Sequence, residues 1–480
     1  MPSASMPAYL DALQAALPPD AVLTTYAQRL VYDCDAYTID KGLPDVVVLP
    51  RTTAEVQAVM RVAEKFNVPV TPRGAGTGLS GGSTAPGGGL MISLARMNQI
   101  VAIDVDNRRA TVQAGVVNLQ LSQAVAPYGL HFAPDPSSQS ACTIGGNVAE
   151  NSGGPHTLKQ GVTVNHVLAV EMVLADGEII WLGSEFDENP GYDLLGAAIG
   201  TEGMLGVVTQ AIVRLTPLPP AVRTFLAIFP SVRTASEAVS AIIGAGLLPA
   251  ALEMLDQPMI RAVEAAFALG LPLDAGAALI IELDGLEESL NEEAEQVTVL
   301  LSRCGATTVT LAANAAEREK LWLARKKAIG AVGRLAPSKV TMDGVIPRTR
   351  LPEVLEAIDA IATAHQLRVA NVFHAGDGNL HPILLFDERN PDEVERVRVA
   401  GAAILKACVD AGGSITGEHG VGMEKREAVG FMFTDADLFA MAQWRRVFDP
   451  TGRMNPHKVF PVRRGCGEGG PRNTGKGGSR

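Results

Sequence analysis

Pro72-Arg73-Gly74-Ala75-Gly76-Thr77-Gly78-Leu79-Ser80-Gly81-Gly82-Ser83 is the stretch that decides the fold of this chain. Positions 76–81 satisfy the dinucleotide pattern G-x-G-x-x-G, which requires a helix to open directly after a strand. A strand is expected over 68–71, but the residues that follow the loop include Pro86-Gly87-Gly88-Gly89, which cannot start a helix. Glycines with positive φ can instead turn several backbone N–H groups inward as an anion-binding nest. The alternative is a flexible surface linker, although Arg73 and the flanking apolar runs favour a loop held by the core.

The composition predicts a globular protein of two or three domains, because 480 residues exceed what one hydrophobic core usually supports. The net charge of −12, without a basic cluster, argues against a nucleic-acid partner. No apolar run approaches the ~20 residues of a membrane span. The absence of Lys and Arg before Arg29 argues against a signal or transit peptide. Five cysteines without C-x-x-C spacing argue against an iron–sulfur cluster, so we expect a cytoplasmic protein with reduced thiols.

The N-terminal half contains two short helical patterns before residue 32 and then mixed α/β patterns. We expect a buried strand at 46–49, followed by a helix that begins with the capping box Thr52-x-x-Glu55 and runs to about 67. Antiparallel pairs are expected for 100–104 with 110–114 and for 167–174 with 178–181. The segment 134–154 is expected to be irregular, and such long loops are usually functional. Together with a small-residue loop at 200–206, followed by a strand at 207–215, these loops predict an extended ligand lying against bare backbone.

The C-terminal half begins at Pro217-x-Pro219-Pro220, where the pattern changes. Two β-α-β-β-α-β units are expected, each a ferredoxin-like arrangement with helices on one face of an antiparallel sheet. The first has strands at 223–229, 250–255, 279–284 and 307–311, with helices at 232–246 and 286–303. The second has strands at 340–345, 368–374 and 381–386, helices at 350–366 and 391–411, and a short extended piece at 414–415. The tail at 463–480 has no apolar period and is expected to be disordered.

A second site is expected in Phe373-His374-Ala375-Gly376-Asp377-Gly378-Asn379-Leu380-His381-Pro382. A turn between two antiparallel strands would place His374 opposite His381, and two imidazoles at strand ends form half of a metal site. Gly417-Glu418-His419-Gly420 supplies a carboxylate and a further imidazole. Two His and one Glu would leave a coordination position open for a substrate oxygen. For each histidine alone, a hydrogen-bonded structural role is the alternative.

With both sites, the sequence resembles the FAD-linked oxidases and dehydrogenases of D-2-hydroxy acids in the vanillyl-alcohol oxidase superfamily. It is most similar there to the glycolate oxidase flavin subunits D, with D-lactate and D-2-hydroxyglutarate dehydrogenases as related members. The resemblance covers about residues 40–462 and is carried by 72–83, 200–206, 374–382 and 417–422. Met342-Asp343-Gly344 and Asn455-Pro456 add to it.

The resemblance implies an α+β fold with a two-subdomain α/β FAD-binding domain at 1–220. It implies a substrate domain, or cap, at 221–454, in which helices cover an antiparallel sheet beside the metal site. Residues 455–462 would return to the FAD domain.

The resemblance also assigns the site residues. FAD, held without a covalent link because the phosphate loop has no His or Cys, would contact Arg73, Gly74, Ala75, Gly76, Thr77, Gly78, Gly81, Gly82, Ser83, Pro134, Asp135, Ser138, Thr143, Gly145, Gly146, Asn147, Gly153, Glu202, Gly203, Val207 and Asn455. His374, His381 and Glu418 would bind a divalent metal, with Zn²⁺ expected. His419 would be the general base, Arg325 would hold the substrate carboxylate, and Lys339 would be a second cation. Ile329 replaces a hydroxyl found in the hydroxyglutarate enzymes, which weakens the case for a dicarboxylate.

These residues suit oxidation of a small D-2-hydroxy acid, of the glycolate or D-lactate type, to a 2-oxo acid. A guanidinium would hold the carboxylate, the metal would lower the pKa of the hydroxyl, His419 would take its proton, and FAD would take the hydride. A separate electron acceptor is expected, either an iron–sulfur subunit, a quinone or a soluble carrier, and it could bring the chain to a membrane surface. A homodimer is left open.

Several alternatives remain at this point. One is a superfamily enzyme that acts on another alcohol, such as an ether lipid or a phenol, or on D-2-hydroxyglutarate. Others are a metal-dependent hydrolase and a non-catalytic binding or assembly subunit.

Overall fold

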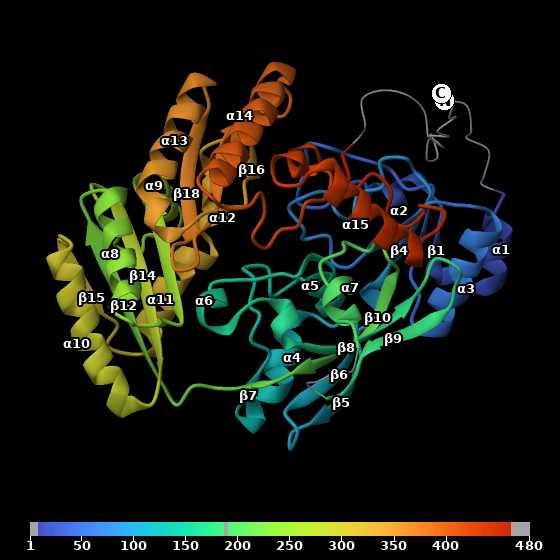
Figure 1. The fold of residues 1–480 in the computed structure, drawn as a ribbon, viewed down its shortest axis with the longest axis horizontal. Coiled ribbons are helices and arrows are strands. Elements are labelled where there is room, and N and C mark those ends of the chain that lie inside the picture. The colour runs from blue at the N-terminus through green and yellow to red at the C-terminus, as the bar shows by residue number, and fades with distance from the viewer. Residues whose placement is uncertain (1–7, 187–190, 462–480) are drawn as a thin grey trace, which may run out of the picture.

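The structure is a computed structural model that describes residues 8–186 and 191–461. Two lobes lie side by side (Figure 1), with the N-terminal half in blue and green and the large sheet of the C-terminal half in yellow to orange. The C-terminal segment, in red, lies back over the N-terminal half. There Trp444 and Phe448 of α15 (Asp435–Phe448) pack against the apolar cluster around the five-stranded sheet of the N-terminal half. The proposed domain limits remain a prediction, and the tail predicted to be disordered lies outside the described residues.

The first sheet of the N-terminal half has four strands in the order β1-β2-β4-β3, and β4 is parallel to both of its neighbours. The strands are β1 Val22–Leu23, β2 Val46–Val48, β3 Val70–Arg73 and β4 Leu90–Ser93, and helices α1 Leu10–Ala16, α2 Tyr26–Leu30 and α3 Thr53–Lys65 accompany them. The Thr52 side chain accepts a hydrogen bond from the Glu55 N–H, as predicted. The reciprocal half of the capping box is wrong, because the Glu55 carboxylate accepts from the N–H of Arg51, one residue earlier than expected.

The second sheet has five strands in the order β5-β6-β10-β8-β9. Its strands are β5 Ile100–Asp104, β6 Arg109–Gln113, β8 Val167–Val173, β9 Ile179–Gly183 and β10 Val207–Arg214, which confirms both predicted antiparallel pairs. Short elements connect them: α4 Asn118–Val125, β7 Leu130–His131, α6 Thr157–Gln160, α7 Leu194–Ala198 and β11 Thr216–Pro217.

The expectation of an irregular segment at 134–154 is wrong at its centre, where α5 spans Ile144–Glu150. The side chain of Thr143 caps this helix by accepting the Gly146 N–H at 3.2 Å. Gly145 is required for close packing, since a Cβ atom there would lie 2.6 Å from the Cβ atom of Ala114. The glycine pair therefore indicates a close backbone approach inside a helix, and not a loop.

The cap is one nine-stranded sheet made of two units joined edge to edge at β13 and β18. The first unit has β12 Ala221–Phe229, α8 Val232–Gly244, β13 Ala251–Asp256, β14 Ala277–Gly285, α10 Glu287–Arg303 and β15 Thr308–Leu311. Its antiparallel order β15-β12-β14-β13 confirms the ferredoxin-like prediction.

The second unit has β16 Ser338–Thr341, β17 Gly344–Val345, α13 Leu351–Ala364, β18 Arg368–His374, β19 Asn379–Leu380, β20 Pro382–Phe386 and α14 Pro391–Asp410. The strand predicted over 340–345 is interrupted at Met342 and Asp343, and the strand predicted over 381–386 begins only after His381. Both interruptions lie where the predicted metal site is placed.

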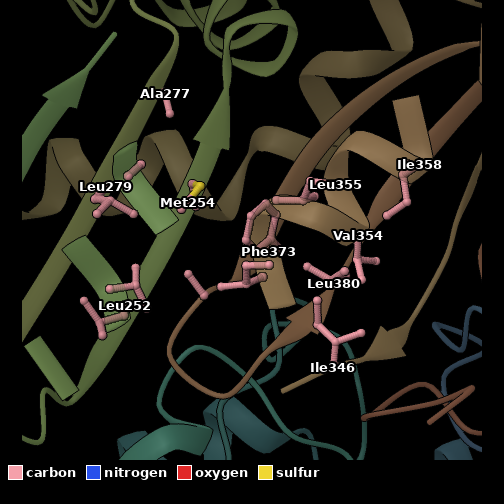
Figure 2. Packing of buried hydrophobic residues seen from close by; sticks show 14 of the residues in the cluster. Leu252, Met254, Ala277, Leu279, Ile346, Val354, Leu355, Ile358, Phe373 and Leu380 are labelled. Atoms are coloured by element: carbon pink, nitrogen blue, oxygen red, sulfur yellow. The ribbon is translucent and has the colours of Figure 1, made fainter. Parts of the chain in front are cut away.

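The expectation that helices cover only one face of this sheet is wrong. Helices α8, α10, α13 and α14 pack on one face, where residues of both units, such as Leu252 and Phe373, share one apolar cluster (Figure 2). The other face is covered by α9 Gln257–Phe267, α11 Ala315–Lys326 and α12 Ala328–Ala331, which pack against residues such as Ile228 and Ile280. Side chains therefore alternate between two buried faces, as along β12. Within the described ranges, no helix combines the length and the apolar character needed to cross a bilayer.

Candidate active site between the two lobes

A cavity of about 350 Å³ lies between the FAD-domain loops and the cap. One wall consists of the glycine-rich loop, the segment around α5 and the small residues near Gly203. The cap wall consists of Arg325, Lys326, Ile329, His381, Glu418 and His419. The two sites predicted separately from the sequence thus face a single space.

The glycine-rich loop is pinned from beneath by Arg73, which is buried at the end of β3. Its Nη1 atom donates to the carbonyl of Cys34 at 2.8 Å and lies 3.4 Å from the hydroxyl of Ser83. Gly76 has φ +72°, and a Cβ atom there would collide with this guanidinium. Only glycine fits this conformation above the arginine, so the loop is a rigid wall and not a flexible linker.

Most of the predicted FAD contacts line the cavity. They are Arg73, Gly74, Ala75, Gly76, Thr77, Gly78, Gly82, Ser83, Ser138, Thr143, Gly145, Gly146, Asn147, Glu202 and Gly203. The remaining predicted contacts, Gly81, Pro134, Asp135, Gly153, Val207 and Asn455, are not among its lining residues. Asn455 instead supports the wall from behind, because its Nδ2 atom donates to the carbonyls of Gly82 and Glu202 at 2.8 and 2.6 Å.

The wall suits an extended cofactor with hydrogen-bonding groups. It exposes backbone and small side chains along its length, and it contains a buried carboxyl oxygen, Glu150 Oε2, without a partner among the described residues. Burial, followed by the nearby Glu202 carboxylate, raises the pKa of Glu150 well above its usual value. A buried polar atom without a partner is costly, and a bound cofactor would supply one. The residues present therefore fit FAD.

Three donor groups meet at the metal site predicted from the sequence. The Nε2 atoms of His374 and His381 lie 3.1 and 3.0 Å from Oε1 of Glu418. The outer ring nitrogens are held in place: His374 Nδ1 lies 2.7 Å from Glu253, and His381 Nδ1 lies 3.3 Å from the carbonyl of Met342. Such outer contacts orient imidazoles whose other nitrogen binds a metal.

The charges at this cluster also favour a cation. Burial lowers the pKa of His374, but Glu253 and Glu418 outweigh burial and raise it to about 10. Burial raises the pKa of Glu418, but His374 and His381 hold it well below its usual value. The carboxylates thus attract positive charge into a buried pocket, and a divalent ion would supply that charge.

Asp343 anchors the loop that carries Glu418 and His419. Its Oδ2 atom accepts hydrogen bonds from the Thr416 hydroxyl at 2.6 Å, from the His419 N–H at 2.9 Å and from Lys425 at 3.1 Å. Asp343 also belongs to a second possible metal grouping with His381 and His419. Its Oδ2 atom is occupied by the three donors above, and its Oδ1 atom accepts from the Glu418 N–H at 3.3 Å and lies 4.0 Å from His381 Nδ1. Sequence reasoning quoted Asp343 in a motif without assigning it a role, although a carboxylate between buried strand residues was a signal.

His419 faces the cavity as a neutral imidazole. Its ring stacks on that of His381, with centroids 4.8 Å apart, and its buried Nδ1 atom has no partner among the described residues. Burial is the largest cause that lowers the pKa of His419, to about 4, against the opposing effect of Asp343. A neutral imidazole with a free nitrogen is a proton acceptor. The predicted role of general base is compatible with this geometry and remains a prediction.

Arg325 is brought to the cavity by α11 and is only 1% exposed. Its Nε atom is paired with the fully buried Glu253, so a free bidentate fork, as sequence reasoning assumed, does not exist. The Nη1 atom is buried without a partner among the described residues. Sequence reasoning missed Glu253, although a carboxylate between Leu252 and Met254 in the strand Ala251–Asp256 could have indicated it.

Lys339 is not brought to the site. It lies in β16, half-buried, and is absent from the lining of the cavity. The lysine that lines the cavity is Lys326, next to Arg325. The Lys326 ammonium lies over the ring of Trp322, 5.8 Å from its centroid.

Comparison with known proteins agrees with this geometry. Residues 44–183 match the family model described as FAD binding domain, and residues 218–459 match the one described as FAD linked oxidases, C-terminal domain. The chain is 46% identical over 470 residues to the glycolate oxidase subunit GlcD of Escherichia coli strain K12, covering 98% of this chain and 94% of the relative. It is 33% identical to a D-lactate dehydrogenase of Anaerostipes hadrus, with coverage of 87% and 90%.

A solved structure of p-cresol methylhydroxylase with bound substrate superposes with a TM-score of 0.80 at 17% identity, covering 94% of this chain and 96% of that one. This likeness concerns the fold alone. Fold and site thus define a FAD-dependent oxidoreductase of the vanillyl-alcohol oxidase type. The chain belongs to the FAD-linked oxidase family, which sets aside the hydrolase and the non-catalytic binding protein.

Proposed function

We propose that this enzyme oxidises a small D-2-hydroxy acid, of the glycolate or D-lactate type, to the corresponding 2-oxo acid. One observation carries the proposal: Arg325 and His419 line one cavity, and each has a buried nitrogen, Arg325 Nη1 and His419 Nδ1, without a partner among the described residues. A 2-hydroxy carboxylate has an anionic end and an acidic hydroxyl at adjacent carbons, which match these two groups. The names of the relatives, glycolate oxidase subunit and D-lactate dehydrogenase, support the same substrate class.

In this proposal Arg325 binds the substrate carboxylate, with Glu253 holding the guanidinium in place. A charge-assisted hydrogen bond in a buried site is strong, and the fixed arginine orients the hydroxyl towards His419. His419 takes the hydroxyl proton, for which its neutral state prepares it. Bound FAD supplies the acceptor for the hydride that leaves C2.

His374, His381 and Glu418 would hold the divalent ion, and zinc suits a set of two His and one Glu. When bound, the metal acts as a Lewis acid that lowers the pKa of the hydroxyl. The chain itself contributes the orientation of these ligands through Glu253, Met342 and Asp343.

The cap wall favours a monocarboxylate. Beside Arg325 it presents the apolar Ile329, where the resemblance places a hydroxyl in enzymes that act on a dicarboxylate. Lys326 lies at the exposed end of this wall and would attract anions without selecting among them.

Reduced FAD needs an acceptor, and we propose a separate one, an iron–sulfur subunit or a quinone. The four cysteines in the described ranges are single free thiols, which cannot hold a cluster. The relative named as a subunit supports a multi-subunit assembly.

The proposal is tested by incubating the FAD-loaded protein with an artificial dye acceptor and candidate acids, and then identifying the product. Glyoxylate from glycolate or pyruvate from D-lactate is expected, with dye reduction in equal amounts. L-lactate and D-2-hydroxyglutarate are the matched controls. Preferential turnover of D-2-hydroxyglutarate would overturn the monocarboxylate assignment.

A further inference from the structure

His156 connects the FAD domain to the cap through two carboxylates. Its Nδ1 atom lies 2.8 Å from Asp135, which precedes the cavity-lining residues Pro136–Ser138, and its Nε2 atom lies 3.3 Å from Glu282 on β14 of the cap. A ring with a carboxylate at each nitrogen is doubly protonated. Burial lowers the pKa of His156, but Asp135 and Glu282 outweigh it and raise the pKa to about 10.

Glu282 in turn holds helix α11. Its carboxylate accepts two hydrogen bonds from Arg318, both at 2.9 Å, and one from the indole N–H of Trp322 at 2.6 Å. The rings of His156 and Trp322 also lie 5.4 Å apart. Residues spaced by four and three positions lie on one face of a helix, as Arg318, Trp322 and Arg325 do. The hydrogen bonds of Arg318 and Trp322 to Glu282 therefore fix the face of α11 that carries Arg325.

The network therefore runs between the two walls of the cavity. It begins at Asp135, next to the cavity-lining Pro136 on the flavin side, passes through His156 and Glu282, and ends at Trp322, one helical turn from Arg325. Glu282 at the centre of the network is buried, and His156 and Asp135 are partly buried. Charged groups that are paired in this way have few alternative arrangements, which suits them to fix a distance. A 1 Å displacement of a binding group can cost about 10²-fold in rate.

We propose that the network of Asp135, His156 and Glu282 sets the position of Arg325 relative to the flavin, so that His156 is a positioning residue of the reaction. This inference rests on the proposed function for its kinetic consequence but not for its structural one. It also gives Asp135 a role different from the flavin contact that the resemblance implied.

Other charged groups surround the network. Lys159 pairs with Asp284 and donates to its carbonyl at 2.8 Å, and this second link between the lobes is more exposed. His131 lies close enough for its pKa to be affected by Asp135 and Asp284, but burial lowers its pKa, so it is neutral at pH 7. His156 is thus the cationic imidazole of this interface, and Lys159 offers a matched control.

The test compares His156→Gln with Lys159→Gln, both loaded with FAD. For His156→Gln we expect KM to rise and kcat to fall, each by about tenfold or more, with unchanged FAD content. We also expect faster amide hydrogen exchange in residues 315–326 and stronger quenching of flavin fluorescence by iodide. Lys159→Gln should stay within about twofold of the parent protein in every measurement.

Parent-like kinetics and exchange in His156→Gln would overturn the proposal, and a lower melting temperature with unchanged kinetics would reduce the network to a structural role. If His156→Gln does not fold, Asp135→Asn tests the same link, because it keeps the side-chain shape and removes one charge. If no 2-hydroxy acid is oxidised, the proposed function fails, and hydrogen exchange and iodide quenching still decide whether the network holds α11.

Discussion

Glu418 and His419 are neighbours in sequence with opposite chemical surroundings. Glu418 lies between the Nε2 atoms of two histidines and keeps its negative charge, whereas burial keeps the His419 ring neutral. Asp343 fixes the loop through the N–H groups of both residues, so each side chain reaches the cavity. This contrast is the reason for assigning one residue to the metal and the other to proton transfer.

The two roles predict different losses. Glu418→Gln should lower bound zinc and activity together, and excess zinc should restore part of the rate. His419→Ala should keep zinc and FAD while losing about 10²–10⁴ in rate, since that is what a general base typically contributes. Metal content by atomic emission and kcat of the same samples give the comparison. A His419→Ala protein without metal would make His419 a ligand and contradict the assignment.

Arg325→Lys should raise KM for the 2-hydroxy acid by about ten- to hundredfold, the effect of one lost hydrogen bond to a charged group. An ammonium cannot pair with Glu253 and still present a second fixed donor to the cavity. FAD content should not change. Lys339→Ala is the control, and parent-like kinetics are expected because Lys339 lies outside the cavity lining. A larger rise in KM for Lys339→Ala than for Arg325→Lys would contradict the assignment of carboxylate binding to Arg325.

At the scale of elements, the sequence predicted the strands well because apolar alternation and turn residues mark them. The prediction is wrong where glycines serve close packing inside a helix and do not form a loop, as at Gly145-Gly146 within α5. It also missed α11, because this helix has many charged residues and only a few buried ones, among them Trp322, so its apolar periodicity is weak. It missed α9 as well, although Asp256 as the N-cap and Pro258 in the first turn are a local signal for a helix start.

The link between α6 and β14 through His156 predicts a stability that depends on pH. The folded-state pKa of about 10 lies above the usual value of 6.5, so folding takes up a proton between these values. The stabilisation is complete below about pH 6.5 and is lost as the pH rises through 10. Thermal unfolding from pH 7 to 10 should therefore show a steeper fall in melting temperature for the parent than for His156→Gln. Parallel curves would show that His156 is not protonated in the folded protein.

At the scale of the whole molecule, the two ferredoxin-like units and the two sites were predictable one by one. Their assembly was not, because it depends on contacts between segments far apart in sequence. Glu253 of the first unit pairs with Arg325 of α11 and, across the β13–β18 junction, with His374 of the second unit. The role of this buried carboxylate cannot be inferred until its partners are located in the structure.

The cofactor should be released intact by acid. Cys142 lines the cavity, but burial raises the pKa of its thiol, which disfavours the nucleophilic thiolate, and the glycine-rich loop offers no His or Cys. After acid precipitation, the yellow colour should be found in the supernatant. Colour that stays with the pellet would indicate a covalent flavin and would point to one of the two cavity histidines.

The central claim is that a D-2-hydroxy acid reduces the flavin held between these two lobes. The most direct measurement mixes the FAD-loaded protein with D-lactate, L-lactate or glycolate under argon and follows the flavin absorbance. Loss of the oxidised flavin band with D-lactate or glycolate, and slower loss with His419→Ala, is the predicted result. A band that persists with these acids, or that bleaches only with the L-isomer, would contradict the account.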